Sequence, residues 1–249
     1  GDVTLKGTNA ATVLNVFIGI TGTATLNGKV SVETSGTGTA TIASGDSLKM
    51  LGGLGGTGTL AVNTRNNAGA LTLGGDVSGF SGTLNLSGAN LYLNADTPLA
   101  GTLHASTAKV TALRKQNVTG TLNAASLAVD GSALSSDGAT LTVSNLALGA
   151  DAGVSLDING NITAGTYTLV SWDNLTAGNF ADAGTMTLTG TLASLYQGTF
   201  NVNTGDKTVT VSVSMADGVV VWDGNPIGAV DNTTTYLFDG THTGVAALT

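Results

Sequence analysis

Short runs in which apolar and polar residues alternate fill most of this chain. Examples are Thr23-Ala24-Thr25-Leu26, Thr83-Leu84-Asn85-Leu86 and Val209-Thr210-Val211-Ser212-Val213. Alternation with a period of two places every second side chain on the same face of a strand, so it is typical of strands with one buried face. Glycine, asparagine and aspartate, which favour turns, separate the runs. The pattern predicts many short strands.

One apolar motif recurs at a constant interval. The four copies are Gly82-Thr83-Leu84, Gly101-Thr102-Leu103, Gly120-Thr121-Leu122 and Ala139-Thr140-Leu141, and their leucines are evenly spaced along the chain. Further columns follow them, with Leu86, Ala105, Ala124 and Val143 two residues after each leucine and Leu91, Val110, Val129 and Leu148 seven residues after it. A fixed period of this kind indicates stacked repeats, because a single copy cannot bury its own apolar face.

The repeat predicts an all-β fold, with a parallel β-helix or β-solenoid built from rungs of about 19 residues. Leu84, Leu103, Leu122 and Leu141 are expected to form one interior column over residues 82–157. Upstream, the same motif places Leu26, Ile42 and Leu60 at less regular intervals, and the stretch Gly52-Gly53-Leu54-Gly55-Gly56 is expected to form a loop or corner. We therefore expect the solenoid to occupy residues 1–158.

The pattern changes after Ile158. The runs 167–172, 186–192 and 200–213 predict longer strands, and most of the aromatic residues lie in this part of the chain. Asn203-Thr204-Gly205-Asp206-Lys207 is typical of a hairpin turn, which would join Phe200-Asn201-Val202 to Val209-Thr210-Val211-Ser212-Val213. We interpret residues 159–214 as a C-terminal β cap or small β-domain, because the end of a solenoid is an exposed sheet edge. Residues 215–249 are expected to form an extended tail or the start of the next repeat block.

Composition supports this fold class and excludes some functions. The 249 residues include 37 glycines and no cysteine, and only 10% are charged, against about 25% in ordinary soluble domains. The net charge is −8, with eight Lys and Arg residues dispersed along the chain, so no basic face is expected to bind nucleic acid. No apolar run has the length of a membrane-spanning helix, and this segment is not expected to insert in a membrane. Because Gly1 follows no signal-like stretch, we expect a mature or excised segment.

Three stretches carry a family resemblance. The run LTLGGDVSGFSGTLNLSGANLYL (71–93) resembles the autotransporter-associated β-strand repeat of bacterial passenger domains. The stretches GTYTLVSWDNLTAGNF (165–180), GTFNVNTGDKTVTVSVS (198–214) and VVVWDGN (219–225) are similar to the segment that commonly closes a block of such repeats. The resemblance covers residues 60–249. It implies a β-helical protein that is secreted or held at the bacterial cell surface, with a structural or adhesive role and no catalytic residues.

No catalytic constellation is expected. The histidines are His104 and His242, and His104 occupies an outward position of a predicted strand. Asp96, Lys109, Arg114, Lys115 and Asp130 offer the residue types used by polysaccharide lyases, but a solvated face or glycan contact accounts for them better. Asp157-Ile158-Asn159-Gly160-Asn161 has oxygen ligands at alternate positions and lacks the spacing of an EF-hand, which favours a turn. We expect no cofactor and no metal.

Three functions remain at this point. The first is an extracellular structural or fibre-forming segment of a bacterial surface protein, whose partners are copies of itself joined head to tail. The second is an adhesin that binds host or matrix glycans, for which Trp172, Asp173 and Asn174 are the candidate contacts, although the sequence favours a buried position in the cap for Trp172. The third is a polysaccharide-degrading enzyme, which the lack of converging carboxylates disfavours.

The proposed assembly depends on the tail. Residues 236–249 followed by residues 1–17 give a continuous alternating run, so the tail could join a tandem copy or add a strand to the next subunit. The apolar residues expected to serve this contact are Val219, Val221, Trp222, Leu237, Phe238 and Val245.

Overall fold

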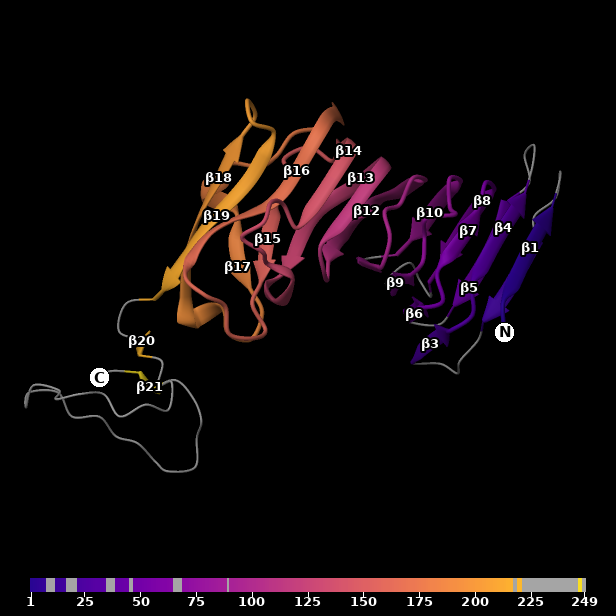
Figure 1. Cartoon of the computed structure of the whole chain (residues 1–249), viewed down its shortest axis with the longest axis horizontal. Helices are drawn as coiled ribbons and strands as arrows, with labels where there is room; N and C mark the ends of the chain where they lie inside the picture. Colours follow the sequence, from indigo (N-terminus) through magenta and orange to yellow (C-terminus); the bar gives the residue numbers. More distant parts are fainter. Residues whose placement is uncertain are drawn as a thin grey trace, which may run out of the picture.

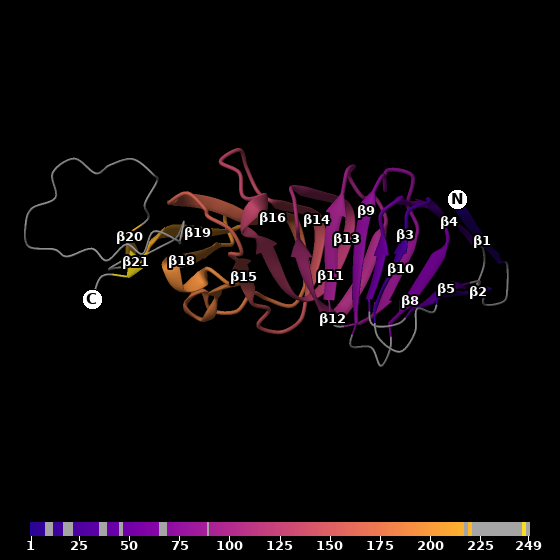
Figure 2. The ribbon, with the colours of Figure 1, turned by 90° about the horizontal axis from the view of Figure 1, so that it is seen from below.

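The computed structural model describes residues 1–7, 12–16, 22–34, 39–44, 47–64, 69–88, 90–216, 219–220 and 246–247. In this part the chain is all-β, with parallel pairing over most of its length and antiparallel pairing near its C-terminal end. The strands lie side by side in a long row, which runs from β1 at one end to β18 and β19 at the other (Figure 1). Viewed at right angles, strands lie on several sides of the same stack (Figure 2).

A first array of parallel strands follows the predicted leucine column. It contains β2 (Thr12–Val16), β5 (Thr39–Ser44), β8 (Thr59–Asn63), β10 (Thr83–Ser87), β12 (Thr102–Ala112), β13 (Gln116–Asp130), β14 (Leu141–Leu148) and β16 (Gly165–Ala177). Leu60, Leu84, Leu103 and Leu122 are aligned in consecutive strands. All four side chains are buried.

A second array runs beside the first. It contains β3 (Thr23–Leu26), β6 (Ser47–Met50), β9 (Ala70–Gly75), β11 (Asn90–Ala95), the later parts of β12 and β13, β15 (Val154–Asp157) and β17 (Thr187–Thr189). Its inner column aligns Leu48, Leu71, Leu91, Val110 and Leu127. These side chains and those of the first array belong to one apolar core.

A third set of pairings involves shorter segments. β1 (Val3–Gly7), β4 (Val30–Thr34) and β7 (Leu54–Gly56) form a separate parallel sheet. Isolated bridges pair Gly56 with Phe80 and Leu99 with Val118. The first residues of β13 and β14 pair with each other, and those of β14 also pair with β16 from Val170 onward. Two parallel strands of one array cannot be joined by a tight turn, so the chain must leave that array and return to it. The strands of the other two arrays form these connections.

The predicted constant spacing holds for only part of the stack. Leu84, Leu103 and Leu122 are in register as predicted, but Leu141 is not, because Leu122 pairs with Leu146. Leu141 instead lies between Gln116 and Val170. The physical reason is that β14 begins alongside the start of β13 and the register shifts between Val118 and Thr121.

The second predicted column also changes register. Leu91 pairs with Val110 as predicted, but Val110 pairs with Leu127 rather than Val129, because β12 carries an irregularity between Ala105 and Lys109. Leu148 pairs with Ala124. Of the remaining column, Ala105 and Ala124 are aligned, whereas Val143 pairs with Val118 and Trp172.

The upstream motifs do not form one column either. Ala40, not Ile42, pairs with Leu60, and Ile42 pairs with Val62. Leu26 belongs to the second array, where it pairs with Met50. Each turn of the chain supplies strands to different arrays. Apolar residues that stand in similar local motifs therefore belong to different arrays and pair with different neighbours.

Close backbone approach explains the glycine-rich corner predicted at residues 52–56. Gly53 and Gly56 have φ angles of +96° and +97°. A Cβ atom at Gly56 would lie 2.1 Å from the carbonyl oxygen of Val32. Leu54, between them, is nevertheless fully buried in β7. The corner is therefore part of the stack and not a projecting loop.

The predicted hairpin is confirmed. β18 (Tyr196–Asn203) and β19 (Thr208–Met215) pair antiparallel, with Phe200 opposite Val211 and Val202 opposite Val209. β19 also pairs antiparallel with the first part of β16. Parallel pairing continues past the expected boundary at residue 158, through β16 and β17. Short 3₁₀ helices, η2 (Gly131–Ala133), η3 (Ala183–Thr185) and η4 (Ala193–Leu195), lie in the connections.

Candidate functional site

The predicted glycan contacts do not form an exposed aromatic patch. Trp172 is only 5% exposed, and its ring centroid lies 4.8 Å from that of Phe180. A tryptophan must expose a ring face to stack on a sugar, so Trp172 is not placed to contact a glycan and lies in the core, the alternative that the sequence favours. Trp172 is in the core because it follows the buried alternation of β16, where Val170 is also buried.

Asp173 and Asn174 are exposed, and both have partners on neighbouring segments of the chain. The main-chain carbonyl of Asp173 accepts a hydrogen bond from Nζ of Lys207 at 2.6 Å. The amide of Asn174 donates to Oδ1 of Asn145 at 3.2 Å. These contacts connect adjacent segments of the stack, which indicates a structural use of both residues.

The residues expected to serve assembly lie mostly outside the described part. This applies to Val221, Trp222, Leu237, Phe238 and Val245. The backbone of Val219 is described in the two-residue strand β20 (Val219–Val220), which pairs antiparallel with β21 (Ala246–Ala247). The assembly hypothesis stays a prediction.

The basic residues Lys109, Arg114 and Lys115 are close together in the sequence, but each one contacts a different partner. Nζ of Lys109 lies 3.5 Å from the carboxylate of Asp157, and Arg114 forms an ion pair with Asp96. Nζ of Lys115 donates to the main-chain carbonyl of Asp137 at 2.6 Å. The three cations therefore do not converge on one point.

The candidate calcium loop is occupied by hydrogen bonds within the protein. The carboxylate of Asp157 accepts from the hydroxyl groups of Ser155 and Thr189. Oδ1 of Asn159 accepts from the backbone N–H of Thr191 at 3.1 Å. Within the described residues, no group of three or more His, Cys, Asp or Glu side chains is placed to hold a metal ion.

His104 lies on the outer surface, as predicted, and His242 lies outside the described residues. The His104 imidazole contacts the side-chain amide of Asn123, its neighbour in the next strand. This contact joins two successive strands on the outer face.

The surroundings of Asp76 lower the pKa of its carboxyl group. Its Oδ1 accepts hydrogen bonds from the N–H and hydroxyl of Ser78, at 3.0 and 2.7 Å, and from the hydroxyl of Thr97 at 2.9 Å. These bonds, with the Lys29 ammonium 3.5 Å away, hold the pKa of Asp76 well below its usual range. The exposed Asp76 carboxylate connects its own turn of the chain to those of Thr97 and Lys29, so its geometry indicates a structural role.

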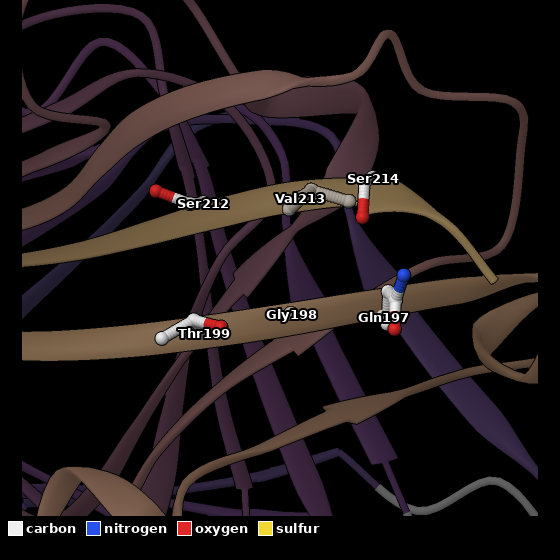
Figure 3. A pocket seen from close by; sticks show the side chains of 6 residues that line it. All are labelled: Gln197, Gly198, Thr199, Ser212, Val213 and Ser214. Carbon is white, nitrogen blue, oxygen red and sulfur yellow. The ribbon is translucent and has the colours of Figure 1, made fainter. Parts of the chain in front are cut away.

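Two concave regions carry polar groups. One lies on the C-terminal hairpin, where Gln197 and Thr199 of β18 stand opposite Ser214 and Ser212 of β19 (Figure 3). It measures about 440 Å³ and is lined by uncharged side chains together with Gly198 and Val213. Most of its polar residues occupy alternate strand positions. The sequence pattern predicts that such positions face solvent, but it does not predict a concave region.

The other region is a groove of about 290 Å³ between successive turns of the stack, which we call the Lys115 groove. Its lining residues are Ala95, Asp96, Thr97, Pro98, Lys115, Gln116, Asn117 and Thr142. Sequence reasoning identified Asp96 and Lys115 as chemistry-bearing but did not place them in one groove. The interval between Asp96 and Lys115 in the sequence corresponds to one turn of the chain. This interval was the sequence signal from which their proximity could have been predicted.

No protein-family model, curated protein or solved structure matches the chain. Among the described residues, no helix has the length and apolar character needed to span a bilayer.

Proposed function

We propose that this chain is a β-solenoid with rungs of unequal length that serves as an extended structural segment of a bacterial surface protein. The observation that carries the proposal is the alignment of apolar residues in two long columns, one in each parallel array. Aligned partners in the first column follow at equal intervals from Leu84 through Leu103 to Leu122, and at a longer interval from Leu122 to Leu146. Insertions between rungs thus leave the stacking intact.

The architecture suits a spacer. Each strand of a stacked array contacts its immediate neighbours, so length can be extended by adding rungs without redesigning the core. Interior positions of the arrays are mostly apolar, whereas outward positions carry Thr, Asn and Ser. The long row of strands separates the two ends of the described stack (Figure 1). A rigid element of this form holds the segments attached to its ends at a fixed separation.

The surface location rests on the resemblance to passenger-domain repeats at residues 60–249. Labelling of intact cells of the source organism with an antibody against this chain tests it. Signal from intact cells supports the proposal, and signal that requires permeabilised cells overturns it.

Head-to-tail assembly through residues 219–249 is the mode of self-association that we propose. An alternating tail can add a strand to the edge of another subunit, where the main chain supplies the hydrogen bonds. In sedimentation velocity and electron microscopy, the full chain is expected to form linear particles that grow with concentration. A chain lacking residues 219–249 is expected to keep its far-ultraviolet circular dichroism and remain monomeric. A strictly monomeric full chain contradicts this mode.

The structural role also implies no turnover of polysaccharides. The carboxylates of Asp96 and Asp157, which lie beside the basic residues, are engaged in ion pairs with Arg114 and Lys109. Reproducible cleavage of a polysaccharide that is abolished by Lys109→Ala or Arg114→Ala would overturn the proposal.

A further inference from the structure

The sequence contains two Asn-Gly pairs, Asn27-Gly28 and Asn159-Gly160, and both lie at bends outside the strands. An Asn-Gly pair cyclises readily, because glycine has no Cβ atom to hinder the attack of its main-chain nitrogen on the asparagine side chain. Asn27 and Asn159 are both exposed, so exposure does not distinguish the two pairs. The surroundings of the two glycines do.

Gly28 is held between the main chains of adjacent turns. A Cβ atom at Gly28 would lie 2.0 Å from the carbonyl oxygen of Gly1, and a Cβ atom at Gly52 would lie 2.3 Å from the carbonyl carbon of Gly28. The peptide between Asn27 and Gly28 must rotate before the glycine nitrogen can approach the side chain of Asn27. Contacts on two sides oppose that rotation.

Gly160 is open on all sides. A Cβ atom placed on it would meet no heavy atom within 4 Å, and the residue is exposed to solvent. Within the described part of the chain, no main-chain carbonyl accepts a hydrogen bond from the Gly160 N–H. The peptide between Asn159 and Gly160 is therefore free to rotate, and its N–H is free to give its proton to water.

The side chain of Asn159 is also activated for attack. Its Oδ1 accepts a hydrogen bond from the main-chain N–H of Thr191 at 3.1 Å. A donor at this oxygen draws electron density from Cγ and stabilises the negative charge that develops on the oxygen when a nucleophile adds to Cγ. The turn after β17 thus supplies a fixed donor to the atom where the charge appears.

We propose that Asn159 is a site of self-modification, in which the main-chain nitrogen of Gly160 attacks Cγ of Asn159 and forms a five-membered succinimide. The C–N bond of the side-chain amide breaks. The proton of the Gly160 N–H passes through water to the leaving amide, which departs as ammonia. One water molecule then opens the ring and leaves aspartate or isoaspartate at position 159.

The isoaspartate product alters the contact between β15 and the turn that follows β17. The N–H of Ile158 donates to the carbonyl of Thr189 at 2.6 Å, and the carbonyl of Ile158 accepts from the N–H of Leu192 at 2.9 Å. Gly190 packs closely here, since a Cβ atom on it would lie 2.5 Å from the carbonyl oxygen of Ile158. Isoaspartate inserts a methylene group into the main chain directly after Ile158, so it displaces this contact and loosens the turn at residues 189–192.

Incubation of the full chain at mildly alkaline pH, followed by proteolysis and mass spectrometry, tests the proposal. In the folded chain, conversion at Asn159 is expected to be about tenfold or more faster than at Asn27, because only the first pair reaches the geometry for attack. In urea the two sites are expected to convert at similar rates, since both lose their surroundings. The rate at Asn159 should rise with pH, because the attacking nitrogen must lose its proton.

Gly160→Ala is the matched variant. The open space around Gly160 accommodates a Cβ atom, so the fold is expected to be unchanged, but the methyl group hinders the attack. Conversion at Asn159 should fall by about tenfold or more, whereas conversion at Asn27 should stay as in the parent chain. An intact Asn159 after incubation, equal rates at the two sites of the folded chain, or an unchanged rate in Gly160→Ala each overturns the proposal.

Hydrogen exchange tests the structural consequence. The Leu192 amide should exchange faster in the incubated parent chain than in the fresh one, and the incubated Gly160→Ala variant should keep its protection. Labelling by an isoaspartate methyltransferase confirms which product is present. Unchanged protection at Leu192 in a chain that carries isoaspartate at position 159 would show that the contact with Ile158 survives, and would overturn this part of the proposal.

Discussion

Leu122 lies in register with Leu146, although Leu141 stands at the interval that the repeat motif would assign to its partner. Both Leu122 and Leu146 are fully buried, and Leu103 flanks Leu122 on the other side. The Leu122 side chain therefore packs between neighbours in two adjacent strands. Its loss should affect the stack in both directions.

We expect Leu122→Ala to lower the free energy of unfolding by about 2–5 kcal/mol, because it removes buried methyl groups and leaves a cavity. Leu122→Asp is expected to unfold or fray the segment, since it buries an unpaired charge. Urea unfolding followed by circular dichroism measures both. Leu51→Ala is the control, because Leu51 is 39% exposed, and a similar loss of stability in that variant would contradict the assigned register.

Gly56 is expected to tolerate no side chain. Its φ of +97° is a conformation that residues with a Cβ rarely adopt, and the added atom would meet the carbonyl oxygen of Val32. Gly56→Ala should lower the free energy of unfolding by more than about 1 kcal/mol. Gly160→Ala is the control, because a Cβ atom there meets no heavy atom within 4 Å. Equal unfolding midpoints for the two variants would show that the corner is not close-packed.

Asp76 is expected to make stability depend on acid. Hydrogen bonds from Ser78 and Thr97, with the Lys29 ammonium nearby, lower the pKa of Asp76 in the folded chain. Its contribution to stability is therefore fully present above the unfolded pKa of about 4 and is lost as the pH falls below that value towards the folded pKa.

Asp76→Asn should accordingly flatten the acid side of a plot of unfolding midpoint against pH, and should lower the midpoint at neutral pH. Asp173→Asn serves as the control, because the hydrogen bond at this residue uses its main-chain carbonyl. An acid limb with the same slope in the Asp76→Asn variant and the parent chain would refute the assignment.

Gln116 is expected to matter more than its polarity suggests. Replacement by leucine keeps the volume but leaves the N–H and carbonyl of Ala95 without the amide that pairs with them. A buried polar group left unpaired costs about 1–3 kcal/mol. Hydrogen exchange at the Ala95 amide should be faster in Gln116→Leu, with Asn117→Leu as the exposed neighbour for comparison. Unchanged protection at Ala95 would contradict the role of this bond.

The sequence predicted the strand content, the hairpin and part of the register. Leu84, Leu103 and Leu122 are aligned because the turns between them have equal length. The pattern failed at Leu141, since alternation says which residues face inward but not which earlier strand they meet. That choice depends on how the connection through η2 brings β14 back to the stack.

The candidate sites were harder to predict for a related reason. Trp172 has the side chain of a sugar-binding residue, but its place in an alternating strand turns it into the core. Gln116 looks like a surface residue and is buried, because its amide replaces a backbone partner for Ala95. Each groove is lined by residues from different strands, so the residues that line it depend on how those strands are paired.

The direction of the strand pairing also determines how the molecule responds to force. Hydrogen bonds between neighbouring strands run along the row of strands and therefore along the long direction of the stack (Figure 1). Tension applied along that direction loads the bonds of one strand at a time at the end of the row, and does not shear many of them together. Each turn of the chain contributes strands to more than one array. When the turn at the end of the row detaches, its strands therefore separate from their neighbours one after another. The chain would then lengthen in steps under load, with each step set by the number of residues in the turn that is released.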